Sequence, residues 1–357
     1  MTLLWINLAI VFICSFFARY FASTTVVVTP IVPIKPNKIL IFGAALSLIL
    51  ISGLRSNIGD TVFYMQSYEL NDFTWELIKT QKDIGFGILQ MQLKKLSDDP
   101  QILVFTTAVI TNVLIIFTLY KYSRMFELSI YIYITGGLFL VSMNGIRQTL
   151  AAAIAFTATK FLMEGSWKKY MLVVAFASFF HQSALILIPM YFVVRFRAWS
   201  KATVALVLLA VIIVIGFNQF STILFSALEN TQYGDYKDYH EGGANILRVI
   251  VNMVPLLIAF LGRNKLKGIF LNNDVIVNMT LLGFVFMLIS TQNWIFARFS
   301  IYFGLYQLIL ISWIVKLFRE KDEKLIYYGV LVFYFIYYYY ENVISLNIIY
   351  KSDYLVW

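Results

Sequence analysis

Residues 167–195 read WKKYMLVVAFASFFHQSALILIPMYFVVR, and the interpretation of this stretch decides the fold. Basic residues stand near both ends, and the polar group His181-Gln182-Ser183 interrupts the apolar run in its middle. A helix needs about 20 apolar residues to cross about 30 Å of hydrocarbon. The 27 residues between Trp167 and Arg195 are too few for two full spans and rather many for one. The stretch is either a short or re-entrant helix pair with His181 at its turn, or a single span.

The composition of the whole chain predicts a membrane protein. Of its 357 residues 60% are hydrophobic and only 13% are charged, whereas roughly a quarter of an ordinary soluble domain is charged. We therefore expect an all-α, polytopic transmembrane helix bundle that forms a single transmembrane domain over residues 1–357. The candidate spans are 3–21, 37–54, 101–120, 128–144, 148–163, 168–181, 182–195, 202–217, 246–262, 275–291, 299–317 and 325–345.

The positions of the 28 Lys and Arg residues predict the topology. These residues fall between apolar runs and form no stripe, so they indicate membrane orientation and not nucleic-acid binding. If residues 167–195 form a helix pair and the N-terminus is outside, the cytoplasmic loops hold 18 of the 28 basic residues. A single span would instead place the basic clusters at 195–201 and 316–324 outside, against the retention of positive charge in the cytoplasm. We therefore prefer the helix pair, which gives about eleven to twelve spans.

Two extracytoplasmic loops, 55–100 and 218–245, are long enough to contain structure. In the first, residues 86–96 place apolar side chains at helical spacing with polar side chains opposite, which predicts an amphipathic helix lying on the membrane surface. In the second, residues 233–243 are polar, aromatic and interrupted by glycine. Such a loop either closes over a ligand or is simply solvated.

The predicted topology gathers the polar residues near span ends on the extracytoplasmic face. Their common side indicates where chemistry would take place. These residues are Arg55, Asp60, Arg147, Gln148, His181, Gln182, Gln292, Asn293 and Arg298.

Arg147 interrupts an apolar stretch that runs from Leu128 to Leu162. A charge within the bilayer is costly unless it faces a cavity or has a partner, so such an arginine is a functional candidate by default. The alternative is an arginine that ends a span by snorkelling. An arginine placed like Arg55 or Arg298 is, taken singly, more often an interface anchor than a ligand contact. The three arginines together would suit a diphosphate, because guanidinium groups match phosphate oxygens bidentately.

Two residues are candidates for proton transfer. An imidazole at the turn of the helix pair suits a general base or a neutral hydrogen-bond donor, and the alternative is that His181 is held by the backbone at a helix break. Asp60 is the carboxylate nearest the span end at Arg55. It would act either as a base or as the structural partner of an arginine.

No cofactor or metal site is predicted. Two histidines and a single cysteine, Cys14, argue against a catalytic zinc site, and no glycine-rich phosphate loop or nucleophile elbow is present. The sequence leaves open a divalent cation held by Asp235, Asp238, His240 and Glu241.

Several motifs together resemble the EpsG family of exopolysaccharide polymerases, which are relatives of the Wzy-type polymerases. The likeness covers most of the chain in order. One departure is that Gly59 and Asp60 are adjacent, where the family commonly has a residue between them. The motifs are Arg55 with Gly59-Asp60-Thr61 and Tyr64, Asp83-Ile84-Gly85-Phe86, Asn144 to Gln148 followed by Thr149-Leu150-Ala151-Ala152-Ala153, His181-Gln182-Ser183-Ala184, and Arg298 before Tyr302.

The resemblance implies a multi-pass protein of the bacterial plasma membrane with a GT-C-like bundle. It implies a glycosyltransferase that polymerises lipid-linked oligosaccharide repeat units into exopolysaccharide or capsular polysaccharide outside the cytoplasm. The donor would be linked to undecaprenyl diphosphate. The other implied partners are the growing polysaccharide chain, the lipid bilayer, and flippase and chain-length regulator proteins.

Such a reaction would assign roles to the candidate residues. His181 or Asp60 would activate the acceptor hydroxyl, arginines would stabilise the departing diphosphate, and aromatic rings would stack on sugars. The residues expected to bind the diphosphate or substrate are Arg55, Arg147, Gln148 and Arg298. Those expected to bind sugar are Trp75, Tyr236 and Trp294.

Two other functions are kept as alternatives. A transporter or flippase would place polar residues near the bilayer midplane and show an inverted repeat, and neither is evident in the sequence. A membrane acyltransferase acting on polysaccharide would also use histidine and arginine, but it should show a route for an acyl donor from the cytoplasm.

Overall fold

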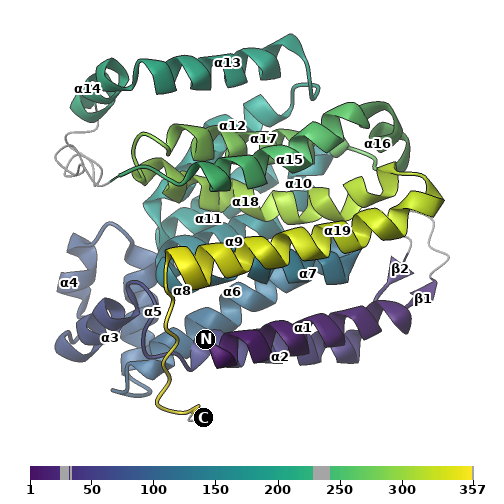
Figure 1. The fold of residues 1–357 in the computed structure, drawn as a ribbon. Coiled ribbons are helices and arrows are strands. Elements are labelled where there is room, and N and C mark those ends of the chain that lie inside the picture. Colours follow the sequence, from purple (N-terminus) through teal and green to yellow (C-terminus); the bar gives the residue numbers. More distant parts are fainter. Residues whose placement is uncertain (25–31, 33, 228–241, 356–357) are drawn as a thin grey trace.

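The computed structural model describes residues 1–24, 32, 34–227 and 242–355, and most of them are helical (Figure 1). Each of the twelve candidate spans coincides with one helix or with consecutive helices, so the all-α fold class is confirmed. The elements are α1 (Thr2–Tyr20), β1 (Ser23–Thr24), β2 (Ile34–Lys35), α2 (Lys38–Gly53), α3 (Thr61–Leu70), α4 (Trp75–Thr80), α5 (Ile84–Lys94), α6 (Gln101–Tyr122), α7 (Phe126–Thr135), α8 (Leu138–Asn144), α9 (Ile146–Thr157), α10 (Thr159–Glu164), α11 (Trp167–Phe180), the 3-10 helix η1 (Gln182–Ile186), α12 (Leu187–Val194), α13 (Lys201–Ile215), α14 (Phe217–Ala227), α15 (Ile246–Leu261), α16 (Arg263–Ile269), α17 (Asn273–Ile289), α18 (Ile295–Ile314), the 3-10 helix η3 (Val315–Leu317), α19 (Glu320–Tyr338) and the π-helix η4 (Tyr339–Ser345).

Helices α9 and α18 form the centre of the bundle. α9 packs against α6, α11 and α18, and its small residues Ala151, Ala152 and Ala153 are all buried. Small side chains let helix backbones approach closely where the lipid supplies no hydrophobic driving force between helices. The short pair β1 and β2 is antiparallel, with Ser23 opposite Lys35.

The outer helices carry the surface that a bilayer requires. α1, α13, α15 and α19 expose large apolar side chains such as Phe16, Ile215, Leu261 and Ile336. A water-soluble protein rarely exposes so much contiguous apolar surface. In lipid hydrocarbon the exposure of this apolar surface carries no free-energy cost, and the helical backbone satisfies its own hydrogen bonds there.

Residues 167–195 form the predicted helix pair. α11 runs from Trp167 to the turn at His181, and η1 with α12 returns along it. On the return, Nη1 of Arg195 lies 3.3 Å from the carbonyl oxygen of Leu162, which precedes α11. With 14 residues α11 is about 21 Å long. Each arm of the pair is therefore shorter than a full span.

The bundle has two distinct ends (Figure 1). One end, here named the basic face, carries the strands, α16 and the clusters at 195–201 and 316–324. There the backbone N–H of Ala198 donates to Asp274 Oδ1 at 3.1 Å. The opposite end, here named the site face, carries α3, α4 and α5 and the turn at His181. The sorting of basic clusters to one side, expected from sequence, is thus reproduced.

The number of helices long enough to span a membrane is smaller than the number of candidate spans. Among the described residues, α1, α6 and residues 295–317 can each cross alone by length and composition, and up to six spans result if each sharply bent helix pair counts as one. The expected eleven to twelve spans are therefore present as helices but not all as full-length ones. Breaks divide them: α7 and α8 meet at 54° at Gly136 and Gly137.

The amphipathic helix predicted from residues 86–96 is present as α5. Phe86, Gln90 and Leu93 are all buried, whereas Leu96 is 77% exposed. α5 packs on α4, α6 and α11. The buried face of this helix, which includes the polar Gln90, therefore packs against protein. The expected position at the membrane surface stays a prediction.

The two ends predict opposite labelling from outside the cell. In a Cys14→Ser background, a membrane-impermeant maleimide should label a Glu76→Cys variant in intact cells and leave a Lys201→Cys variant unlabelled. Both substituted side chains are exposed, at the site face and the basic face respectively. Positive charge is retained on the cytoplasmic side. Permeabilised cells, in which both variants react, are the control, and labelling of Lys201→Cys in intact cells would reverse the topology.

Candidate active site

The carboxylate of Asp83 is the centre of a charged cluster at the site face. Its Oδ2 lies 2.9 Å from Nη1 of Arg147 and 3.1 Å from Nδ1 of His181. Its Oδ1 accepts the backbone N–H of Gln182 at 3.0 Å. The side chain is only 4% exposed. Burial by itself raises the pKa of Asp83, but the hydrogen bond to His181 and the charges of His181 and Arg147 lower that pKa below its ordinary value.

Arg147 is held in place on two sides and open on another. Its Nε donates to the hydroxyl of Tyr64 at 3.3 Å, and its guanidinium lies 5.7 Å from the Tyr64 ring centre and 6.0 Å from that of Phe86. The side chain is 42% exposed. A snorkelling anchor would need no buried carboxylate, so the ion pair with Asp83 favours a positioned, accessible cation.

Gly85 brings this cluster together. A Cβ atom on Gly85 would lie 2.9 Å from the carbonyl oxygen of Phe179 and 2.8 Å from its Cβ. The start of α5 therefore touches the end of α11 directly. Asp83 lies two residues before Gly85, and His181 lies two residues after Phe179. The side chains of Asp83 and His181 can meet because Gly85 has no Cβ to hold the two helices apart.

A second contact joins the start of α3 to the end of α8. Gly59 has φ +52°, and an added Cβ would lie 1.9 Å from Oδ1 of Asn144. That oxygen accepts the backbone N–H of Asp60 at 2.9 Å. Asp60 lies close enough for its charge to act on Arg147, while the carboxylate that contacts His181 is Asp83.

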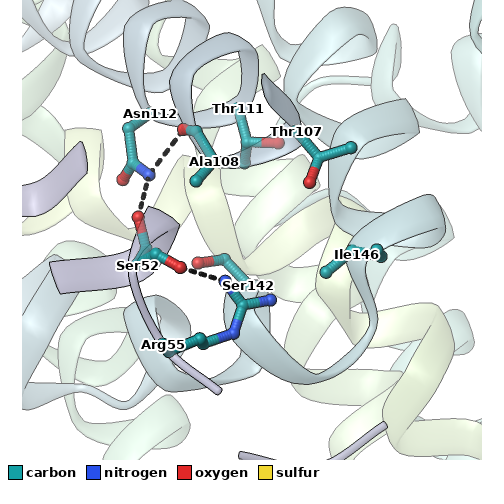
Figure 2. A pocket seen from close by; sticks show the side chains of 8 residues that line it. All are labelled: Ser52, Arg55, Thr107, Ala108, Thr111, Asn112, Ser142 and Ile146. Atoms are coloured by element: carbon teal, nitrogen blue, oxygen red, sulfur yellow. Dashed lines mark hydrogen bonds between the residues drawn. The ribbon is translucent and has the colours of Figure 1, made fainter. Parts of the chain in front are cut away.

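Arg55 lies inside the bundle, where it bonds to Ser52 and faces Ser142 (Figure 2). It is 1% exposed. Its Nε donates to Thr61 Oγ1 at 2.9 Å, its Nη2 to the carbonyl of Met143 at 2.7 Å, and its Nη1 to the carbonyl of Ser52. The side chains around it fill the space that they enclose. The structure therefore does not bring Arg55 to Arg147. The hydrogen bonds of Arg55 instead connect α2, α3 and α8.

Gln148 is also buried, and its side chain also connects neighbouring helices. Its Nε2 donates to the carbonyl of Arg298 at 2.8 Å and lies 3.4 Å from Ser183 Oγ. The Ser183 hydroxyl is in turn 2.7 Å from the Tyr302 hydroxyl. These contacts tie α9 and α18 to η1, immediately after His181.

A cavity of about 470 Å³ opens beside the cluster. The turn at residues 144–148 contributes to both, since Asn144 lines the cavity and Arg147 binds Asp83. Trp294 and Arg298 also line the cavity, and the guanidinium of Arg298 lies 4.8 Å from the Trp294 ring centre. The structure therefore brings these two predicted residues together, next to the cluster and not within it.

Of the two other predicted sugar-binding residues, only Trp75 lies within the described residues. Trp75 begins α4 and is about half exposed, and it is not among the residues that line the cavity. Tyr236 lies outside the described residues, as do Asp235, Asp238, His240 and Glu241. Within the described ranges, no group of three or more His, Cys, Asp or Glu residues could hold a metal ion.

Sequence reasoning missed three residues of these sites. Asp83 lies in a motif that was noted, but its role required knowing that α5 touches α11. Arg248 and Glu341 form an ion pair on the cavity wall. Glu341 is the only charged residue between Lys324 and Lys351, and a lone carboxylate in a candidate span is a signal that could have identified it.

The Gly85 contact predicts a specific loss of stability. Gly85→Ala should lower the midpoint of thermal unfolding, because an overpacked contact of this kind costs about 1–3 kcal/mol. Gly268→Ala is the matched control, since a Cβ there meets nothing within 4 Å. Thermal unfolding of the two purified variants tests this. An unchanged midpoint for Gly85→Ala would show that α5 and α11 are not in contact.

Comparison with known proteins places the chain. No curated protein and no solved structure matches it. The model of the EpsG family, which comprises Wzy-like polysaccharide polymerases, matches residues 38–352. This range is nearly the whole chain and contains the complete Asp83 cluster and the cavity beside it, so the protein belongs to the EpsG family.

Proposed function

We propose that this protein is a glycosyltransferase that joins lipid-linked oligosaccharide repeat units into a polysaccharide outside the cytoplasm. Membership of a polymerase family supports the reaction class. The observation that carries the proposal is the buried carboxylate of Asp83, which contacts both Arg147 and His181 at one end of the bundle. A cation and an imidazole so placed supply the two functions that this transfer needs.

His181 is the proposed general base. Its Nδ1 faces Oδ2 of Asp83. A protonated Nδ1 therefore donates a hydrogen bond to the carboxylate, and the unprotonated Nε2 remains to accept a proton. Nε2 takes the proton of the acceptor hydroxyl as its oxygen attacks the anomeric carbon of the donor. Asp83 orients the ring and stabilises the imidazolium, as a carboxylate does beside a histidine base. Asp60 is kept as the second candidate base.

Arg147 is the proposed electrophilic group. As the bond between the anomeric carbon and the diphosphate oxygen breaks, negative charge develops on the leaving diphosphate. A fixed guanidinium stabilises that charge at little reorganisation cost. In the resting protein Asp83 and Tyr64 hold Arg147 in place, and its exposed edge is available to the diphosphate. Arg298 and Trp294 would contact the same donor from the cavity wall.

The remaining parts of the proposal concern place and partners. The basic face would lie in the cytoplasm of a bacterial plasma membrane and the site face outside it. The donor would be carried on undecaprenyl diphosphate, and the product would be an exopolysaccharide or capsular polysaccharide. A flippase would deliver the donor and a chain-length regulator would act on the product.

Substitution of either group should reduce polymer by far more than it reduces the amount of folded protein. Per molecule of folded protein, we expect His181→Ala and Arg147→Ala to reduce polymer by more than about a hundredfold, the usual contribution of a positioned base or charge-stabilising donor. The measurement is the chain-length distribution made by purified protein reconstituted with a lipid-linked oligosaccharide. Arg263→Ala, an exposed arginine on the basic face, is the matched control and should leave the products unchanged.

The same reconstitution separates the alternatives. Full-length polymer from both variants would overturn the site assignment. Movement of the lipid-linked oligosaccharide across the bilayer without chain extension would identify a flippase. Acyl transfer to the glycan would identify an acyltransferase.

A further inference from the structure

The cavity contains a charged pair that the chemistry proposed above does not use. Arg248 lies in the first turn of α15, and Glu341 lies in the π-helix η4. Nε and Nη2 of Arg248 both donate to Oε1 of Glu341, the former at 2.7 Å. The other carboxylate oxygen, Oε2, is buried and has no hydrogen-bond partner among the described residues. Since the side chain is only 5% exposed, this pairing leaves a buried charge incompletely satisfied.

The backbone around Glu341 is also unusual. η4 is a π-helix over Tyr339–Ser345, and at its end the N–H of Leu346 bonds to the carbonyl of Glu341 at 2.9 Å. π-Helical turns are rare and occur frequently at functional sites. This one places Glu341 and Asn342 side by side, both buried and both lining the cavity.

The cavity itself is amphiphilic. Its polar end lies at the site face, where two arginines and one glutamate give the described lining a net charge of +1. Its deeper wall is apolar and includes Ile132, Val251 and Leu308. Ligand sites of this size are ordinarily mostly apolar with a few placed polar groups.

The helices that flank the cavity are bilayer-facing. α15 packs on α17 and α18, and α19 packs on α7. Each contributes residues to the cavity wall, Asn252 from α15 and Tyr334 from α19 among them. Each also exposes apolar side chains outward, such as Ile250 and Ile336. The Arg248–Glu341 pair thus joins two elements at the boundary between the cavity and hydrocarbon.

We propose that this cavity binds an amphiphile with a phosphate-bearing headgroup, whose hydrocarbon chain lies along the apolar wall between α15 and α19. Arg248 exchanges the single Oε1 atom of Glu341 for two phosphate oxygens, which a guanidinium binds bidentately. The identification of this amphiphile with the lipid diphosphate donor rests on the proposed function. A bilayer phospholipid has the same chemistry and is the other source.

Ligand binding to the purified full-length protein in detergent tests the site. The probe is geranylgeranyl diphosphate, and affinity is read from tryptophan fluorescence and thermal stabilisation. Geranylgeraniol and inorganic diphosphate should each bind at least about tenfold more weakly, because each lacks one half of the recognition. Arg248→Gln should weaken binding of the probe by about tenfold or more. The matched control is Arg263→Gln, which should bind the probe like the wild type.

Glu341→Gln distinguishes a ligand site from a structural ion pair. Removing the carboxylate raises the net charge of the described lining from +1 to +2 and frees Arg248, so the probe should bind several-fold more tightly. A structural pair predicts lower stability and no gain in affinity. Asn252→Phe, which fills the cavity and leaves the pair intact, should prevent binding of the chain.

The outcomes separate this site from the proposed function. Equal binding of phosphatidylglycerol supports the site and identifies a bilayer lipid as its occupant, whereas preference for the diphosphate identifies the donor. Wild-type affinity in Arg248→Gln, together with unchanged affinity in Asn252→Phe, would overturn the site and leave polymerisation by the Asp83 cluster standing. Failure of polymerisation in reconstitution, with binding intact, would overturn the function and leave the site.

Discussion

The carboxylate of Asp83 joins three parts of the chain that are far apart in sequence. It precedes α5, pairs with Arg147 at the start of α9, and receives the side chain of His181 and the backbone of Gln182 at the turn after α11. A buried carboxylate persists only where cations and donors satisfy it, and removing one member leaves the others with an uncompensated charge. The cluster therefore forms as a unit. The position of the imidazole and of the guanidinium, on which the proposed transfer depends, follows from this one group.

The elements around the cluster hold it in place by contacts that leave little freedom. Gly85 lets α5 touch α11, Gly59 lets α3 touch Asn144, and Arg55 and Gln148 fasten the turn at residues 143–148 from the bundle side. Side chains locked by a second layer of hydrogen bonds are what a preorganised site requires. The same turn borders the cavity, so a donor held there would lie next to the proposed base. Rigid support on one side and a cavity on the other are what the proposed transfer from a lipid-linked donor would require.

Local patterns predicted most of the fold, because apolar runs and basic loops are properties of short segments. The twelve candidate spans became helices, and charge bias correctly favoured the pair at 167–195. The break at Gly137, which has φ +88°, was not predicted, since helix kinks depend on neighbouring packing. The structure brings the two candidates Arg147 and His181 together at one end of the bundle, but the other candidates are arranged differently. Arg55 turns inward and Asp83 occupies the centre, because these orientations arise from helix contacts that no single segment contains.

The most direct test of this account is the energetic coupling between Asp83 and Arg147. A double-mutant cycle of Asp83→Asn and Arg147→Gln, measured as the free energy of unfolding in mixed micelles, isolates that coupling. Contacting partners in one buried network couple by about 0.5–3 kcal/mol, and we predict a value in the upper half of this range. The double variant should lose less free energy of unfolding than the sum of the losses of the two single variants. Strict additivity would contradict the account, because it would mean that the carboxylate and the guanidinium do not depend on each other.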